Sequence, residues 1–260
     1  MHGYDASTYG ERWADVYDEW YDDPDEVAAT VACLAAVAGP PERGSGPLLE
    51  LGIGTGRIAL PLASQGYDVR GVDASPAMVE VLRGKADAAT IPVHMGDIAD
   101  LRCPPLPHED APPACRGVFV AYNTFFNLAD EGAQRACLAG VSRVLAPDGW
   151  FLCAAFVPDL DEPAPARGTV GVRTLTTDRV VLTADRHDTA AQTISGQYID
   201  ITTAGIALRP FHIRYVLPPQ LDHMASDAGL ELVERWGGWD REPFDDTSAV
   251  QVALYRRRAG

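Results

Sequence analysis

Three glycines at alternating positions are the part of the sequence best suited to bind a ligand. Gly52, Gly54 and Gly56 lie in 47-PLLELGIGTGRIALPLA-63, after a short apolar run and before a helix-like one. Glycine lets the backbone turn sharply and approach a ligand where no side chain fits. A dinucleotide-binding turn has the spacing G-x-G-x-x-G, but Arg57 occupies the position of its last glycine, which disfavours NAD and FAD. A phosphate-binding P-loop is disfavoured too, because no Gly-Lys-Ser/Thr follows.

Two acids follow the glycines at the ends of the next expected strands. Asp73 lies in 71-GVDAS-75 and Asp97 lies in 96-GDI-98. Open α/β sheets bind ligands at the carboxyl ends of their strands. There Asp73 can accept hydrogen bonds from both hydroxyls of a ribose, Asp97 can accept from an exocyclic amine, and Ile98 can cover a purine ring. Two alternatives stay open: Asp73 caps the helix that follows it, and Asp97 is a turn residue.

These motifs together resemble those of a known family. The set ELGIGTG, VDAS, GDI and AGLELVERWGGW is similar to class I S-adenosylmethionine (SAM)-dependent methyltransferases, from about residue 9 to the end. The resemblance is greatest to small-molecule N- and O-methyltransferases of actinobacterial type, which carry a similar β insertion. It implies SAM as cofactor, S-adenosylhomocysteine (SAH) as product and a small molecule as methyl acceptor.

The resemblance also implies roles for individual residues. The glycines would approach the methionine half and the ribose, and the acids would bind the ribose and the adenine. The segment 121–128 would lie under the sulfonium, with the side chains from 122 to 127 facing the substrate. The candidate cofactor-binding residues are Tyr9, Tyr17, Glu50, Gly52, Gly54, Gly56, Asp73, Ala74, Met78, Asp97, Ile98, Ala121 and Phe126.

The sequence shows no unmistakable general base. Methyl transfer is an in-line displacement that alignment and desolvation promote, and a base is needed only when the acceptor must lose a proton. His212 is the histidine expected to lie on a strand that faces the substrate, although most such histidines are structural. The candidate catalytic residues are His212, Tyr122 and Asn123, and the candidate substrate contacts are Tyr122, Asn127, Arg214 and Tyr215.

An aromatic stripe marks the N-terminal region. Tyr9, Trp13, Tyr17 and Tyr21 recur every four positions, which places them on one face of a helix. In the resembling family an N-terminal helix folds over SAM, so Tyr9 or Tyr17 would touch the ligand. Plain packing on the sheet is the alternative, and it is the expected role of Trp13.

Strands and helices are expected to alternate after residue 47. The expected strands are 48–51, 68–72, 93–95, 117–123, 150–156, 230–236 and 249–255, and the expected helices are 58–65, 77–87, 133–145 and 218–229. This pattern predicts an α/β fold with a doubly wound, Rossmann-like, mostly parallel seven-stranded sheet. Short β-rich runs at 169–216 predict an antiparallel meander appended to that sheet.

The expected organisation is therefore one domain with additions. Residues 1–38 form an N-terminal helical lid. Residues 39–157 and 217–260 form the SAM-binding, Rossmann-like domain. Residues 158–216 form an inserted β-layer that contributes to the substrate wall.

Composition narrows the function further. The net charge of −16 disfavours nucleic acid and anionic membranes as partners. No apolar stretch approaches the roughly 20 residues of a membrane helix, and five scattered cysteines are typical of a reduced, cytoplasmic protein. No metal site is expected; Asp159 and Asp161 are the only plausible start of one.

The sequence thus predicts a cytoplasmic, SAM-dependent methyltransferase that acts on N or O of a small metabolite or natural product. Two alternatives remain: a SAM-binding enzyme that does not methylate, such as a cyclase or decarboxylase, and a non-catalytic SAM-binding accessory protein. The oligomeric state is open, with a homodimer as one candidate.

Overall fold

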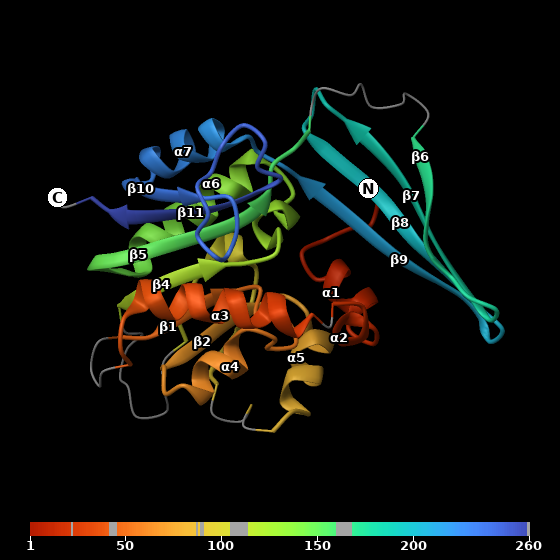
Figure 1. The fold of residues 1–260 in the computed structure, drawn as a ribbon, viewed down its shortest axis with the longest axis horizontal. Coiled ribbons are helices and arrows are strands. Elements are labelled where there is room, and N and C mark those ends of the chain that lie inside the picture. Colours follow the sequence, from red (N-terminus) through yellow and green to blue (C-terminus); the bar gives the residue numbers. More distant parts are fainter. Residues whose placement is uncertain are drawn as a thin grey trace.

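A computed structural model describes residues 1–21, 23–41, 46–86, 88, 91–104, 114–159 and 168–258. Its centre is a seven-stranded sheet with the strand order β10-β11-β5-β4-β1-β2-β3 (Figure 1). The strands are β1 (Leu48–Leu51), β2 (Val69–Asp73), β3 (Val93–Met95), β4 (Cys115–Val120), β5 (Leu145–Phe156), β10 (Leu230–Trp236) and β11 (Val250–Arg257). Only the pairings of β11 with β5 and β10 are antiparallel. The predicted α/β class and mostly parallel sheet are confirmed.

Helices cover both faces of this sheet. The helices are α3 (Pro24–Ala38), α4 (Ala59–Ser64), α5 (Pro76–Arg83), α6 (Glu131–Val144) and α7 (Pro218–Asp227). Successive residues of a strand point to opposite faces. Leu48 and Leu152 accordingly pack in the core with α3, α4 and α5, whereas Leu49 and Cys153 pack in the core with α6 and α7. No described helix is long and apolar enough to cross a membrane.

A second sheet lies between β5 and α7 in the chain. Its strands are β6 (Thr169–Leu175), β7 (Arg179–Asp188), β8 (Thr193–Thr202) and β9 (Gly205–Arg214), paired antiparallel in chain order. Figure 1 shows these strands projecting away from the central sheet. The predicted meander is present, but it forms a sheet of its own rather than extra strands of the first one. Asp161, named above as a start of a metal site, lies outside the described residues.

The N-terminal region is helical but broken. The helices α1 (Thr8–Trp13) and α2 (Tyr17–Trp20) precede α3, and Figure 1 shows them between the two sheets. Asp23 ends the break by capping α3, since its side chain accepts a hydrogen bond from the Glu26 amide at 3.0 Å. Despite the breaks, the aromatic stripe stays together: the ring centroids of Tyr9 and Trp13 lie 5.0 Å apart, and those of Tyr17 and Tyr21 lie 4.8 Å apart.

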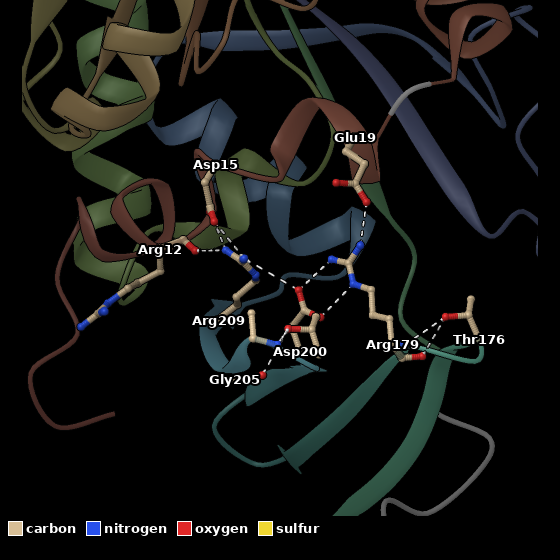
Figure 2. A network of polar contacts seen from close by, with 10 residues as sticks. Arg12, Asp15, Glu19, Thr176, Arg179, Asp200, Gly205 and Arg209 are labelled. Carbon is tan, nitrogen blue, oxygen red and sulfur yellow. Dashed lines mark hydrogen bonds and ion pairs between the residues drawn. The ribbon is translucent and has the colours of Figure 1, made fainter.

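A buried ion-pair network fastens this region to the second sheet (Figure 2). Asp200, on β8, accepts hydrogen bonds from Arg179 at 2.8 and 2.7 Å. Arg209, on β9, donates to Asp15 at 2.6 and 3.0 Å and to the Arg12 carbonyl at 2.7 Å. The Arg179 hydrogen bonds hold the pKa of Asp200 below its usual range, against the effect of burial. The two sheets and the N-terminal helices are thus held as one unit.

We expect Asp200→Asn to lower the free energy of unfolding by about 3 kcal/mol, the low end of the range for a broken buried ion pair. The substitution leaves Arg179 and Arg209 without their shared charge, and Arg179 is partly exposed. Urea unfolding measures the loss. Asp178→Asn, at an exposed turn position, is the control and should change stability little. Equal effects of the two variants would contradict a stabilising role for the network.

Candidate active site

The first of two neighbouring cavities lies at the carboxyl ends of β1 and β2. Its walls come from the N-terminal helices, the glycine turn, the ends of β2 and β3, and residues 124–128. Of the predicted cofactor-binding residues, Tyr9, Tyr17, Gly52, Gly54, Asp73, Ala74, Met78, Asp97 and Ile98 line this cavity. Glu50, Gly56, Ala121 and Phe126 are not among its lining residues.

The three glycines have different physical roles. All three have positive φ angles, of 69°, 54° and 80°, which favour glycine. A Cβ at Gly52 would lie 2.4 Å from Thr124 Cγ2, and a Cβ at Gly56 would lie 2.4 Å from Leu82 Cδ1. A Cβ at Gly54 would meet only the Gly52 carbonyl, at 3.9 Å. Internal packing therefore explains Gly52 and Gly56, and Gly54 alone opens toward space that a ligand can fill.

Asp73 connects the glycine turn to the end of β2. Its two carboxylate oxygens accept hydrogen bonds from the Gly54 amide at 2.7 Å and the Ser75 amide at 2.8 Å. Burial raises the pKa of this carboxyl, and the backbone amides oppose the rise. The cap of α5 is Ser75, which accepts from the Met78 amide at 3.2 Å. The alternative that Asp73 caps this helix is therefore wrong.

Asp97 is a turn residue that also lines the first cavity. Its side chain accepts a hydrogen bond from the Ala99 amide at 2.8 Å, as a turn residue does, and it also lines the first cavity. Ile98 follows it and lines the same wall. Ala74 and Met78 follow β2, whereas Asp97 and Ile98 follow β3. All four residues line the same cavity because parallel strands end at one edge of the sheet.

The N-terminal helices cover the first cavity closely. A Cβ at Gly10 would lie 2.3 Å from Ser75 Cβ, so only glycine allows α1 to approach α5 this closely. Glu11 accepts hydrogen bonds from the Ser75 hydroxyl at 2.7 Å and the Ala77 amide at 3.0 Å. Asp18 accepts from the Thr55 hydroxyl, in the glycine turn, at 2.6 Å. Gly10, Glu11 and Asp18 were missed by the sequence analysis.

The second cavity, of about 390 Å³, adjoins the first. Tyr9, Tyr17, Thr124 and Asn127 line both cavities and mark their junction. The remaining wall is mostly aromatic and includes residues from both sheets. Its other lining residues are Trp13, Tyr21, Glu26, Arg57, Tyr122, Asn123, Phe156, Tyr198, Phe211 and Ile213.

The phenols at this wall are hydrogen-bond donors rather than bases. Burial raises the pKa of Tyr9, Tyr17, Tyr21 and Tyr122, so their hydroxyls stay protonated at neutral pH. The Tyr9 and Tyr21 hydroxyls lie 3.4 Å apart. The Tyr17 hydroxyl makes no hydrogen bond to another described residue, and Tyr17 lines both cavities. No described residue therefore competes with a ligand for this hydroxyl.

Two consecutive residues with positive φ shape the loop after β4. Tyr122 has φ 53° and Asn123 has φ 68°. Left-handed backbone at a non-glycine residue costs about 1–3 kcal/mol and is common at functional sites. The Asn123 side chain offsets part of this cost, because its Oδ1 accepts a hydrogen bond from the Phe156 amide at 2.7 Å. Asn123 thus shapes the cavity, and the Tyr122 hydroxyl is bonded to that of Thr30 at 2.8 Å.

Arg57 lines the second cavity. From the sequence it was noted only because it occupies the position of the last glycine in a dinucleotide-binding turn. Its guanidinium stacks on the Tyr122 ring, 3.9 Å from the ring centroid. Glu50 lies behind the cavity and is buried, with no hydrogen-bond partner for its Oε2 in the described structure. Burial raises the pKa of Glu50 well above its usual range. No motif in the sequence signalled the stacked guanidinium.

His212 does not face either cavity. Its neighbours Phe211 and Ile213 line the second cavity, and alternate residues of a strand point to opposite faces. The His212 Nδ1 is instead hydrogen-bonded to the Ser195 hydroxyl at 2.6 Å, and its ring packs edge-on against Tyr4. The expectation that His212 lies at the substrate, as a catalytic base, is therefore corrected.

The other predicted residues outside the cavities have structural partners. Arg214 is bonded to Gln134 and Glu131 and lines a separate cavity beside α7. Tyr215 is fully buried, and its hydroxyl is bonded to His187 Nε2 at 2.9 Å. Phe126 is fully buried against Phe156, and Ala121 is buried at the end of β4.

Known proteins share this arrangement. Residues 48–149 match the family model described as a methyltransferase domain. The solved structure of the CcbJ methyltransferase from Streptomyces caelestis is 36% identical, with a TM-score of 0.85 over 99% of this chain and 100% of that one. The chain belongs to the class I SAM-dependent methyltransferases.

Two further relatives are more distant. The cypemycin N-terminal methyltransferase of Streptomyces sp is 29% identical over 81% of this chain and 83% of that protein. The amino pentose methyltransferase CalS10 of Micromonospora echinaspora is 21% identical, with a TM-score of 0.65 over 94% of this chain and 97% of that one. CalS10 shows that the fold is shared.

The residues that line the first cavity of this methyltransferase are suited to hold SAM. Gly54 leaves open space beside the turn, and the Asp73 carboxylate retains acceptor capacity after its two backbone hydrogen bonds. Asp73 would hold the ribose, and Asp97 and Ile98 would hold the adenine. When bound, SAM supplies an electrophilic methyl group on a sulfonium. Tyr17 and Asn127, at the junction, would then orient the acceptor toward it.

We expect Asp73→Ala to weaken SAH binding by roughly ten- to several-hundred-fold. Hydrogen bonds to a charged acceptor contribute about 1.5–3 kcal/mol each, and one or two would be lost. Calorimetry measures the affinity. Asp130→Ala is the control: it removes the cap of α6, which also costs about 1 kcal/mol of stability, at a residue that lines neither cavity. Normal SAH affinity in Asp73→Ala would remove Asp73 from the cofactor site.

We expect Gly54→Val to abolish measurable SAH binding, because its side chain fills the open space beside the turn. Gly54→Ala is the milder variant: it carries a backbone strain of about 1–2 kcal/mol with much less bulk than the β-branched valine, which is strained further at a positive φ. We expect the alanine variant to keep part of the SAH affinity. SAH binding by the valine variant at the level of the wild type would show that the turn does not adjoin the cofactor.

Proposed function

We propose that this methyltransferase transfers a methyl group to an amine nitrogen of a small molecule that binds in the second cavity. The volume of about 390 Å³ lies within the range of small-ligand pockets, which span roughly 300–1,000 Å³. The net charge of −16 argues against a nucleic-acid acceptor. The aromatic wall suits an acceptor with an apolar body.

The observation that carries the choice of nitrogen is the absence of a general base at the junction. The described residues that line the second cavity include no histidine and no cysteine. The one carboxylate among these residues is that of Glu26, which does not line the first cavity. The atom that receives the methyl group must lie between the two cavities. The phenols are protonated, as argued above. The site therefore offers little help in removing a proton before attack.

An amine fits such a site better than an alcohol. A neutral amine attacks with its own lone pair and loses its proton only after the new bond has formed, whereas an alcohol must lose its proton before or during attack. With SAM bound, the methyl group would pass from its sulfur to the amine nitrogen, and the methylated ammonium would lose its proton to bulk water after leaving the site. The chain contributes alignment at Tyr17 and Asn127 and exclusion of water by the N-terminal helices. The names of the cypemycin N-terminal and KedS8 sugar N-methyltransferases agree with this proposal.

The test is methyl transfer from labelled SAM to matched amines and alcohols with the same aromatic or aliphatic body. We expect label in the amines, and a rate that rises with pH through the acceptor's own pKa, so that the inflection moves when an amine of different pKa is used. A fixed inflection would point instead to a titrating group of the protein. Label in the alcohols but not in the amines would refute the proposal.

A further inference from the structure

Arg57 is a partly buried cation in the wall of the second cavity. Its side chain is 13% exposed and does not line the first cavity. Its Nη1 donates a hydrogen bond to the Tyr21 carbonyl at 2.6 Å. No hydrogen bond or ion pair with a described residue engages its Nη2 or Nε. One edge of the guanidinium fork therefore has no hydrogen-bond partner among the described residues.

Other arginines of low exposure in the same chain pair closely with carboxylates. Arg70 pairs with Asp68 at 2.7 Å, Arg209 with Asp15 at 2.6 Å, Arg214 with Glu131 at 3.1 Å and Arg235 with Asp222 at 2.5 Å. The carboxylate oxygen paired with Arg57 belongs to Glu26 and is 3.7 Å away, too far for a hydrogen bond. Burying a charge is costly unless it is paired. Arg57 thus lacks the close carboxylate that its counterparts have.

The two acids near Arg57 do not serve as a close carboxylate partner. The Glu26 side chain is 44% exposed, so water solvates it. Glu50 is buried and makes no ion pair with Arg57 in the described structure, and its Oε2 has no hydrogen-bond partner. Burial raises the pKa of Glu50 well above its usual range, against the opposing effect of the Arg57 charge. Neither acid neutralises the guanidinium at hydrogen-bond distance.

The surroundings hold the guanidinium in one place. The Tyr122 ring lies under it at 3.9 Å and is itself fixed by the bond from its hydroxyl to Thr30 and by the positive φ of Tyr122. A planar guanidinium with a free edge is suited to bind a carboxylate through two parallel hydrogen bonds. The rest of the cavity is lined largely by aromatic rings.

We propose that Arg57 binds a carboxylate of the methyl acceptor, so that the acceptor is an apolar amine that also carries an acid group. This inference rests on the proposed function for two points: that the acceptor binds in the second cavity and that it is an amine. The carboxylate of the cofactor is the other group that could bind the Arg57 guanidinium in the same way. The position of Arg57 in the second cavity, and not in the first, favours the acceptor.

The test measures binding alone and uses phenylacetate and its neutral match, phenylacetamide, on the full chain saturated with SAH. We expect the wild type to bind phenylacetate at least about tenfold more tightly than phenylacetamide, as one hydrogen bond between charged groups would produce. Arg57→Met should abolish this preference, and Arg57→Lys should retain part of it. Arg235→Met, which also removes an arginine of 13% exposure but away from both cavities, should keep the full preference.

Two outcomes would overturn the inference at this cavity. One is a wild type that does not prefer the acid, whether it binds both probes equally or neither. The other is a preference that survives in Arg57→Met. If the methionine variant melts far below the wild type, the lysine variant decides instead: an unchanged preference there means that the fork does not bind the acid.

A second binding measurement tests whether Arg57 binds the carboxylate of the cofactor instead. It uses SAH and 5′-methylthioadenosine, which lacks the amino-acid half. We expect Arg57→Met to change the affinity for each by less than about twofold. A loss of SAH affinity with unchanged methylthioadenosine affinity would assign Arg57 to the cofactor and overturn the proposal. The failure of amine methylation would be visible separately, because none of these binding measurements requires methyl transfer.

Discussion

The Asp73 carboxylate holds together the elements that form the active site. Its hydrogen bonds to the Gly54 and Ser75 amides join the turn after β1 to the start of α5. The turn needs this support because three of its residues have positive φ. The same carboxylate faces the first cavity, so one side chain both orders the wall and is presented to the ligand. Desolvation of such an acid is costly, and the two amides offset that cost.

The N-terminal helices complete both cavities at once. Glu11 and Asp18 attach them to α5 and the glycine turn, and Arg209 attaches them to the second sheet through Asp15. Trp13 stands between these attachments, fully buried, with its indole nitrogen donating to the Pro210 carbonyl at 3.0 Å. A single short segment therefore supplies a wall of both cavities. The inserted sheet matters to the chemistry through this segment as well as through its own side chains.

The sequence predicted the central sheet and the first cavity because both follow from one strand pattern. Apolar runs alternating with helical segments fix the strand ends, and parallel strands bring Asp73 and Asp97 to one edge. The second cavity was harder to predict. Strand alternation gives two faces of β9 but not which one is inner, so His212 was placed on the wrong side. Arg57 was overlooked because its partners, Tyr21 and Tyr122, are near it only in space.

The two cavities differ in how they can bind a charged molecule. The first is lined by the carboxylates of Asp73 and Asp97, which suit the hydroxyls and the amine of a nucleoside. The second has protonated phenols, aromatic faces and the cation Arg57. If the acceptor atom is nitrogen, as proposed, the aromatic faces would stabilise the positive charge that develops on it, since the face of an aromatic ring is electronegative. A carboxylate on the acceptor, held at Arg57, would offset the charge of the guanidinium that lines the same cavity. The proposed amine and the proposed acid group of the acceptor are thus compatible with the charges of this cavity.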